Sequence, residues 1–188
     1  MAILMASLPW WLSSCNQGPE QLADDQFQEV KIGNEYQLKV PKYLKKTDSL
    51  QADTAVTLQY QNNAKQAYVI VLGEPKGEQA ETIKAIAGYN PKLSIVQNYR
   101  DFRMKYTKDV IKVTKEYPVK PLKINGLNAE IVHLDGIIDH QGKEGPIAYS
   151  MAFIEGKNKM YSVMAWTSLA QRAHFADTFQ KILTSFKQ

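Results

Sequence analysis

The sequence predicts an α+β domain in which a mainly antiparallel sheet is flanked by helices. After residue 27, apolar residues alternate with polar ones at period two over many short segments, and turns of a few residues join those segments. Apolar residues at helical spacing occur only in the middle of the chain and at its end. The order of strands, helices, an antiparallel meander and a final helix is typical of an α+β domain.

The first half of the sequence predicts four strands. Residues 30–32 and 36–40 flank a Gly-Asn pair, which favours a hairpin, and residues 56–60 alternate again. Residues 67–73, AYVIVLG, are apolar on both faces, so we expect a central strand covered on two sides. The cover is either helices on both faces, or helices on one face and a long loop on the other.

Helical spacing then replaces alternation. Residues 78–88 predict a short helix closed by Gly88, and a longer helix is expected after Pro91. In the longer helix one apolar stripe predicts the buried face, and its members are Ile95, Tyr99, Phe102, Tyr106 and Val110.

The second half predicts a meander and a closing helix. Residues 119–124 and 127–139 are joined by an Asn-Gly turn, and residues 146–155 and 159–167 continue the alternation. Ser168 is the expected N-cap of the last helix. The apolar stripe of that helix consists of Phe175, Phe179, Ile182, Leu183 and Phe186.

Two segments resemble a known family. Residues 160–187, MYSVMAWTSLAQRAHFADTFQKILTSFK, are similar to the end of PsbP-like and DcrB-like domains, and YQLKVPKYL at residues 36–44 resembles their entry strand. The resemblance covers residues 27–188 and rests on core-packing patterns. It implies an α/β/α sandwich around an antiparallel sheet, and a class of mostly non-catalytic accessory proteins, many of them lipoproteins. It brings no set of functional residues.

The first residues predict a membrane anchor. Residues 1–14 carry no charged side chain, and Leu12-Ser13-Ser14-Cys15 resembles a bacterial lipobox, although no basic residue precedes the apolar run. We therefore expect a signal peptide at 1–14, a flexible tether at 15–26 and one globular domain at 27–188. A diacylglyceryl thioether on Cys15 plus an acylated amine would hold the protein on a lipid bilayer. The alternative is a buried N-terminal strand with a core cysteine.

This anchor predicts a location in the bacterial cell envelope. Asn16 is not the aspartate that retains many lipoproteins on the inner membrane, so we expect the outer membrane, facing the periplasm. Nucleic acid is not an expected partner of an exported protein. The sequence leaves two kinds of partner open, an envelope protein and an anionic lipid or polymer.

Basic residues gather in one region. The chain has a net charge of +4, and residues 100–123 hold eight basic and three acidic side chains, a net charge of +5. The alternatives are a solvated helix face and a surface for an anionic partner. The residues of that candidate surface are Arg100, Arg103, Lys105, Lys108 and Lys112.

The sequence does not favour an enzyme or a cofactor. It has no nucleophile elbow, phosphate loop or dinucleotide fingerprint, so we expect a non-catalytic accessory or binding module. His133, Asp135, Asp139 and His140 are weak metal candidates, because their spacing matches no recognised metal motif. The second hypothesis is a carrier, in which some of the 10 tyrosines and 6 methionines line a pocket between sheet and helix for a small apolar or anionic ligand. A cavity of several hundred Å³ would favour it.

Overall fold

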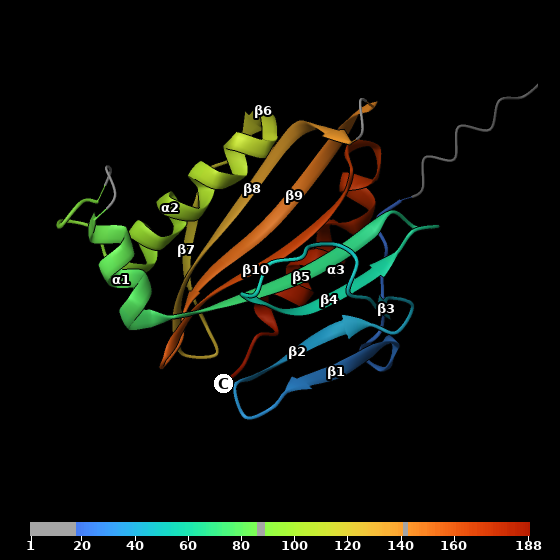
Figure 1. Ribbon diagram of the computed structural model, residues 1–188. Helices are drawn as coiled ribbons and strands as arrows, with labels where there is room; N and C mark the ends of the chain where they lie inside the picture. Colours follow the sequence, from blue (N-terminus) through green and yellow to red (C-terminus); the bar gives the residue numbers. More distant parts are fainter. Residues whose placement is uncertain (1–17, 86–88, 141–142) are drawn as a thin grey trace, which may run out of the picture.

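One antiparallel sheet forms the centre of the computed structural model, which describes residues 18–85, 89–140 and 143–188 (Figure 1). The strands lie in the order β3-β4-β5-β10-β9-β8-β6, and β7 also pairs with β8 along the edge that faces away from β9. The prediction of a mainly antiparallel sheet flanked by helices is confirmed. The strands are β3 (Lys45–Lys46), β4 (Val56–Asn62), β5 (Ala67–Pro75), β6 (Ile111–Glu116), β7 (Lys120–Ile124), β8 (Leu127–His140), β9 (Lys143–Glu155) and β10 (Lys159–Ser168).

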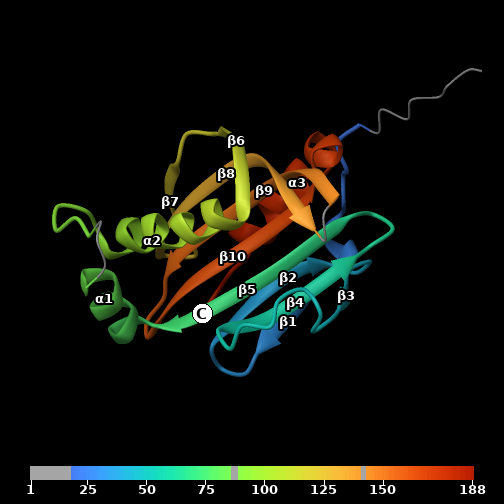
Figure 2. The same cartoon turned by 45° about the horizontal axis from the view of Figure 1, so that its top comes forward.

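Helices cover both faces of this sheet, which is the first of the two arrangements expected from the sequence. The α3 face carries helix α3 (Arg172–Thr184) and the hairpin of β1 (Phe27–Ile32) and β2 (Tyr36–Pro41). The α2 face carries α1 (Lys76–Ala85) and α2 (Ile95–Val110). Figure 2 shows α2 in front of the sheet and α3 behind it. Alternate residues of each strand therefore enter two separate cores.

The closing helix packs as its stripe predicts. All five stripe residues are buried in the α3-face core, although Phe186 lies two residues after the end of the helix. Its predicted start is wrong, because Ser168 makes no side-chain capping bond and precedes a short 3-10 turn, η2 (Leu169–Gln171), before α3 begins.

The predicted stripe of α2 is only partly right. Ser94 caps the helix by accepting a hydrogen bond from the Gln97 amide, and Tyr99 is fully buried. Tyr106 and Val110, however, are 51% and 67% exposed. The helix stops at Val110 because the next six residues pair with β8 as the edge strand β6, which the sequence analysis did not predict.

The packed domain begins before residue 27. A 3-10 turn, η1 (Asp24–Gln26), leads into β1, and the Glu20 carboxylate accepts hydrogen bonds at 2.8 Å from the hydroxyls of Tyr43 and Thr178. Leu22 packs against the α3-face core. The expected flexible tether therefore does not extend over residues 18–26, because two side chains of this segment are fixed by the domain.

Candidate functional site

An open groove runs across the α2 face of the sheet. It consists of two cavities of about 460 Å³ and 470 Å³, both of which are lined by Leu50, Ile138 and Trp166. Because the cavities share these side chains, we describe them as one groove with two lobes. Each lobe is within the range of volumes that hold small ligands.

Three neighbouring strands, β5, β10 and β9, form the floor of the groove. Their antiparallel register places side chains of the same face in rows across the strands, two residues apart. The first and third rows are therefore about 13 Å apart. The rows are Leu72-Ser162-Phe153, then Ile70-Met164-Met151, then Tyr68-Trp166-Tyr149.

The third row is a stack of aromatic rings. The Trp166 ring lies between those of Tyr68 and Tyr149, with centroid distances of 5.3 and 5.6 Å and interplanar angles of 16° and 21°. Tyr149 is 8% exposed, and burial raises the pKa of its hydroxyl. Among the described residues this hydroxyl has no hydrogen-bond partner, so it is a free donor on the groove floor.

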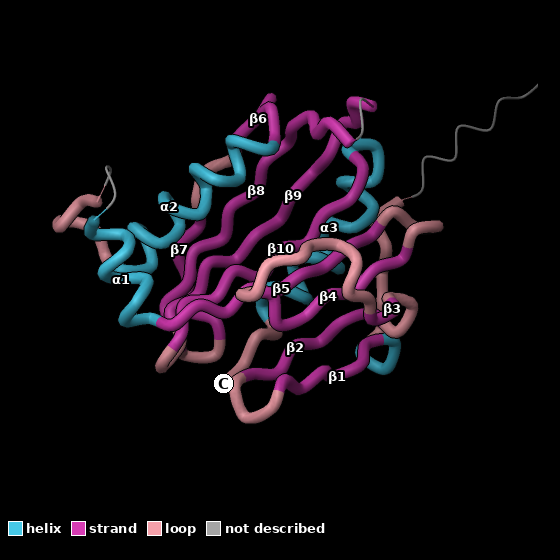
Figure 3. The backbone as a smooth tube through the Cα atoms, viewed as in Figure 1, coloured by secondary structure: helices cyan, strands magenta, loops and turns pink. Residues whose placement is uncertain are grey.

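Two segments form the walls. On one side stands the end of α2, with Tyr106, Thr107 and Val110. On the other side residues 47–55 cross the same face of the sheet as a loop, which Figure 3 shows in pink beside β4. Gln59 of β4 fixes this loop, because its side-chain oxygen accepts from the amides of residues 50 and 51 at 2.9 and 3.0 Å.

A buried polar network lies at the inner end of the groove. The Glu74 carboxylate accepts hydrogen bonds from the Tyr99 hydroxyl at 2.6 Å and from the Gln79 amide at 2.9 Å. The Tyr99 hydroxyl also lies 3.0 Å from that of Ser162. Burial, followed by the charge of Glu74, raises the pKa of Tyr99 and keeps its hydroxyl protonated as a donor.

Comparison with known proteins gives a likeness in structure alone. No family model and no curated protein matches the sequence. The solution structure of cyanobacterial PsbP (CyanoP) from Synechocystis sp. PCC 6803 aligns over 94% of this chain and 98% of its own, with a TM-score of 0.56 and 10% identity. The chain has a PsbP-like fold. The fold that the sequence resemblance implied is thereby confirmed.

Two further solved structures align with this chain. A point mutant of protein Mog1 aligns over 86% of this chain and 95% of its own, with a TM-score of 0.56 and 12% identity. LpqN of Mycobacterium tuberculosis, involved in cell envelope biogenesis, aligns over 86% and 90%, with a TM-score of 0.45 and 11% identity. At these identities the likeness concerns the fold.

The five predicted basic residues do not form one free cationic surface. Arg100 is 15% exposed at its side chain and donates to the buried Glu130 at 2.5 Å and to Asp101. Lys108 pairs with Glu116 at 2.6 Å, and Lys105 is exposed. Lys112 lies on β6 instead of the helix. Arg100 and Arg103 lie on the side of α2 that faces the sheet, so their side chains are mostly buried.

Arg103 differs from Arg100 although both face a buried carboxylate. Its guanidinium lies 3.6 Å from Glu74, too far for a hydrogen bond, and no other side-chain partner occurs among the described residues. It is 18% exposed at its side chain and lines the groove together with Ser162. Most of its five N–H donors therefore remain available to a ligand.

The predicted metal candidates make other contacts. His133 and Asp135 share a face of β8, as predicted, but the His133 ring lies 2.9 Å from the Ser150 hydroxyl and Asp135 pairs with Arg172. Asp139 also has an interaction within the structure. In the described part of the chain no cluster of three His, Cys, Asp or Glu residues suits a metal ion, and the ring of His140 lies outside the described side chains.

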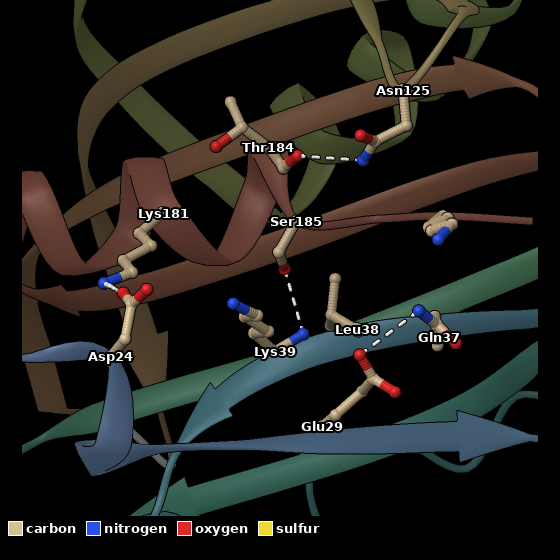
Figure 4. Close-up of a pocket in the computed structure, with 10 residues that line it drawn as sticks. Asp24, Glu29, Gln37, Leu38, Lys39, Asn125, Lys181, Thr184 and Ser185 are labelled. Atoms are coloured by element: carbon tan, nitrogen blue, oxygen red, sulfur yellow. Dashed lines mark hydrogen bonds and ion pairs between the residues drawn. The ribbon is translucent and has the colours of Figure 1, made fainter.

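A second cavity, of about 390 Å³, lies beside the C-terminal end of α3 (Figure 4). Its polar groups mostly bind one another. The Lys39 amide donates to the Ser185 hydroxyl at 2.9 Å, Gln37 donates to Glu29 at 3.2 Å, and Lys181 pairs with Asp24. The first of these contacts joins β2 to the end of α3, the second links β1 with β2, and the third joins α3 to η1.

The anchor candidate, Cys15, and the predicted signal peptide at 1–14 lie outside the described residues. Within the described ranges, none of the helices has the length and apolar character needed to cross a membrane.

The second hypothesis from the sequence expected a pocket lined by tyrosines and methionines between sheet and helix, but it named none of the residues that line the groove. The aromatic residues of the groove were visible as members of three alternating strands, but their stacking depends on the register that places Tyr68 and Tyr149 opposite Trp166. The sign available in the sequence was one large aromatic ring on the same face of each predicted strand.

Proposed function

We propose that this chain is a non-catalytic binding module, held on a bacterial envelope membrane through Cys15, that binds a small ligand with an apolar body in the α2-face groove. The groove itself supports the ligand-binding part. Its floor offers Met164 and Met151, which adapt to irregular ligand shapes, between an aromatic row and a polar end. The lobe that contains Met164 is lined mostly by apolar side chains with a few polar ones, which is typical of small-molecule sites.

A fluorescence titration tests ligand binding. The chain has three tryptophans, Trp10, Trp11 and Trp166, so a full-length Trp10→Phe/Trp11→Phe protein reports from the groove alone. We expect decanol, a neutral amphiphile, to shift Trp166 emission saturably. Met164→Lys should abolish the shift, because it places a charge on the groove floor. Val119→Lys, at an exposed position that does not line the groove, is the matched control.

The envelope anchor is supported by the lipobox-like residues and is tested separately. Intact-mass spectrometry of natively expressed protein should show loss of residues 1–14 and a diacylglyceryl addition at Cys15. Cys15→Ala should move the protein from the membrane fraction to the soluble fraction. A retained first methionine without an acyl addition would overturn the anchor and leave the groove untouched.

A further inference from the structure

We propose that the groove selects an anionic amphiphile, whose carboxylate binds Arg103 while its chain lies along the methionine row toward the Tyr68-Trp166-Tyr149 stack. This inference rests on the proposed ligand-binding function and names its ligand class. The two arginines of α2, the row spacing and the position of Asp109 support it.

Arg103 is a charged donor that the fold leaves incompletely used. Both oxygens of its counterion, Glu74, already accept hydrogen bonds, one from Tyr99 and one from Gln79. The ion pair at 3.6 Å therefore compensates the charge of Arg103 without using its donors. Arg100, one helical turn earlier, shows the saturated arrangement, with donors given to Glu130 and Asp101. A planar guanidinium with free N–H groups suits a carboxylate, which it can bind through two parallel hydrogen bonds.

The groove also gives the ligand a direction. Arg103 lines it together with Ser162 of the first row, and the aromatic row lies about 13 Å further along the strands. Ile70, Met164 and Met151 lie between these two ends. A head group at Arg103 with an extended apolar chain therefore matches the order of polar and apolar side chains along the floor.

Asp109 opposes the reverse orientation. This exposed carboxylate also lines the groove, six residues after Arg103 and so about 9 Å further along the axis of α2. A ligand carboxylate is repelled at the Asp109 end and attracted at the Arg103 end. The free hydroxyl of Tyr149 belongs to the aromatic row, at the other end of the groove from Arg103, so it does not compete with Arg103 for the head group.

The deciding experiment compares decanoate with decanol at pH 8, using Trp166 emission in the Trp10→Phe/Trp11→Phe protein. The two probes share a chain length and differ in the charge of the head group. We expect decanoate to bind about tenfold more tightly or better, the effect of a charge-assisted hydrogen bond to a partly buried arginine. Equal affinities would overturn the carboxylate assignment while the proposed ligand-binding function stands. Binding of neither probe would overturn the proposed function itself.

Variants then assign the preference to one side chain. Arg103→Gln should bring the affinity for decanoate down to that for decanol. Lys105→Gln removes the same charge from an exposed position on the same helix and should leave the preference unchanged. If Lys105→Gln reduces the preference as strongly as Arg103→Gln, the attraction comes from the general positive field and Arg103 is not the binding residue. If the Arg103→Gln protein does not fold, the comparison of decanoate with decanol in the unsubstituted groove still tests the proposal.

Discussion

The two faces of the sheet are made by alternate residues of the same strands, yet one is closed and the other open. On the α3 face, four apolar residues of α3, Phe186 just after it and the β1-β2 hairpin fill the core. On the α2 face, the helix buries Val96, Tyr99 and Met104 but ends with Tyr106 and Val110 exposed beside the groove. The closed face therefore stabilises the domain, while the open one has surface left for binding.

The largest effect is expected from truncation on the closed face. Phe179 is 3% exposed and stacks on Phe175 at 5.5 Å, so Phe179→Ala should lower the free energy of unfolding by about 3–5 kcal/mol. Met164→Ala on the open face should cost about 1 kcal/mol, because this side chain already borders empty space. Urea unfolding of both variants measures the difference. Equal losses would mean that the groove is filled in solution.

Substituting a larger side chain at two adjacent residues also tests the difference between the closed and the open face. Val163 and Met164 of β10 point to opposite faces, and Val163 is fully buried. Val163→Phe should cost about 2 kcal/mol through overpacking, whereas Met164→Phe should change stability by less than about 1 kcal/mol. Met164→Phe should also weaken decanol binding, because the new ring occupies the groove. A larger loss for Met164→Phe than for Val163→Phe would contradict an open α2 face.

The fold could be predicted from the sequence because it depends on local patterns. The burial of the residues from Phe175 to Phe186 and the continuous apolar run of residues 67–73 each require only their own segment, and both predictions are confirmed. Strand β6 was missed because Val113, three residues after Val110, continues the apolar spacing of α2, and only pairing with β8 makes this segment a strand.

The site could not be predicted in the same way, because its properties depend on contacts between distant segments. Arg103 and Arg100 look alike in the sequence. Glu130, on β8, accepts a hydrogen bond from Arg100, whereas Glu74, on β5, already accepts one from Gln79. These contacts determine that Arg103 is the arginine that keeps free donors. Likewise Gln59 is an ordinary polar residue of β4 until its side chain fixes residues 50 and 51 as a groove wall.

Removing a tyrosine hydroxyl should have different effects on stability at the buried end and at the exposed end of the open face. Tyr99→Phe removes the hydroxyl that donates to Glu74 and contacts Ser162, so we expect a loss of about 1–2 kcal/mol for the polar groups left without a partner. Tyr106→Phe, on the exposed part of the same helix, should be neutral within about 0.5 kcal/mol. Equal stability of the two variants in urea unfolding would show that the network contributes nothing to stability.

The smallest effect is expected from pH on the closed face. Burial, followed by the positive charges of Arg172 and Lys120, lowers the pKa of His133 below its ordinary value of 6.5, while Asp135 opposes this shift. Near pH 6 the unfolded chain therefore takes up a proton more readily than the folded one, so the free energy of unfolding should fall as the pH drops below about 6.5. His133→Gln should flatten this part of the profile without changing the steeper loss at lower pH, where carboxylates titrate. His133 and its neighbour Ser150 lie on the α3 face, opposite the groove. His133→Gln should therefore leave decanol binding in the groove unchanged. A stability that rises between pH 7 and pH 6 would show that the Asp135 charge outweighs burial.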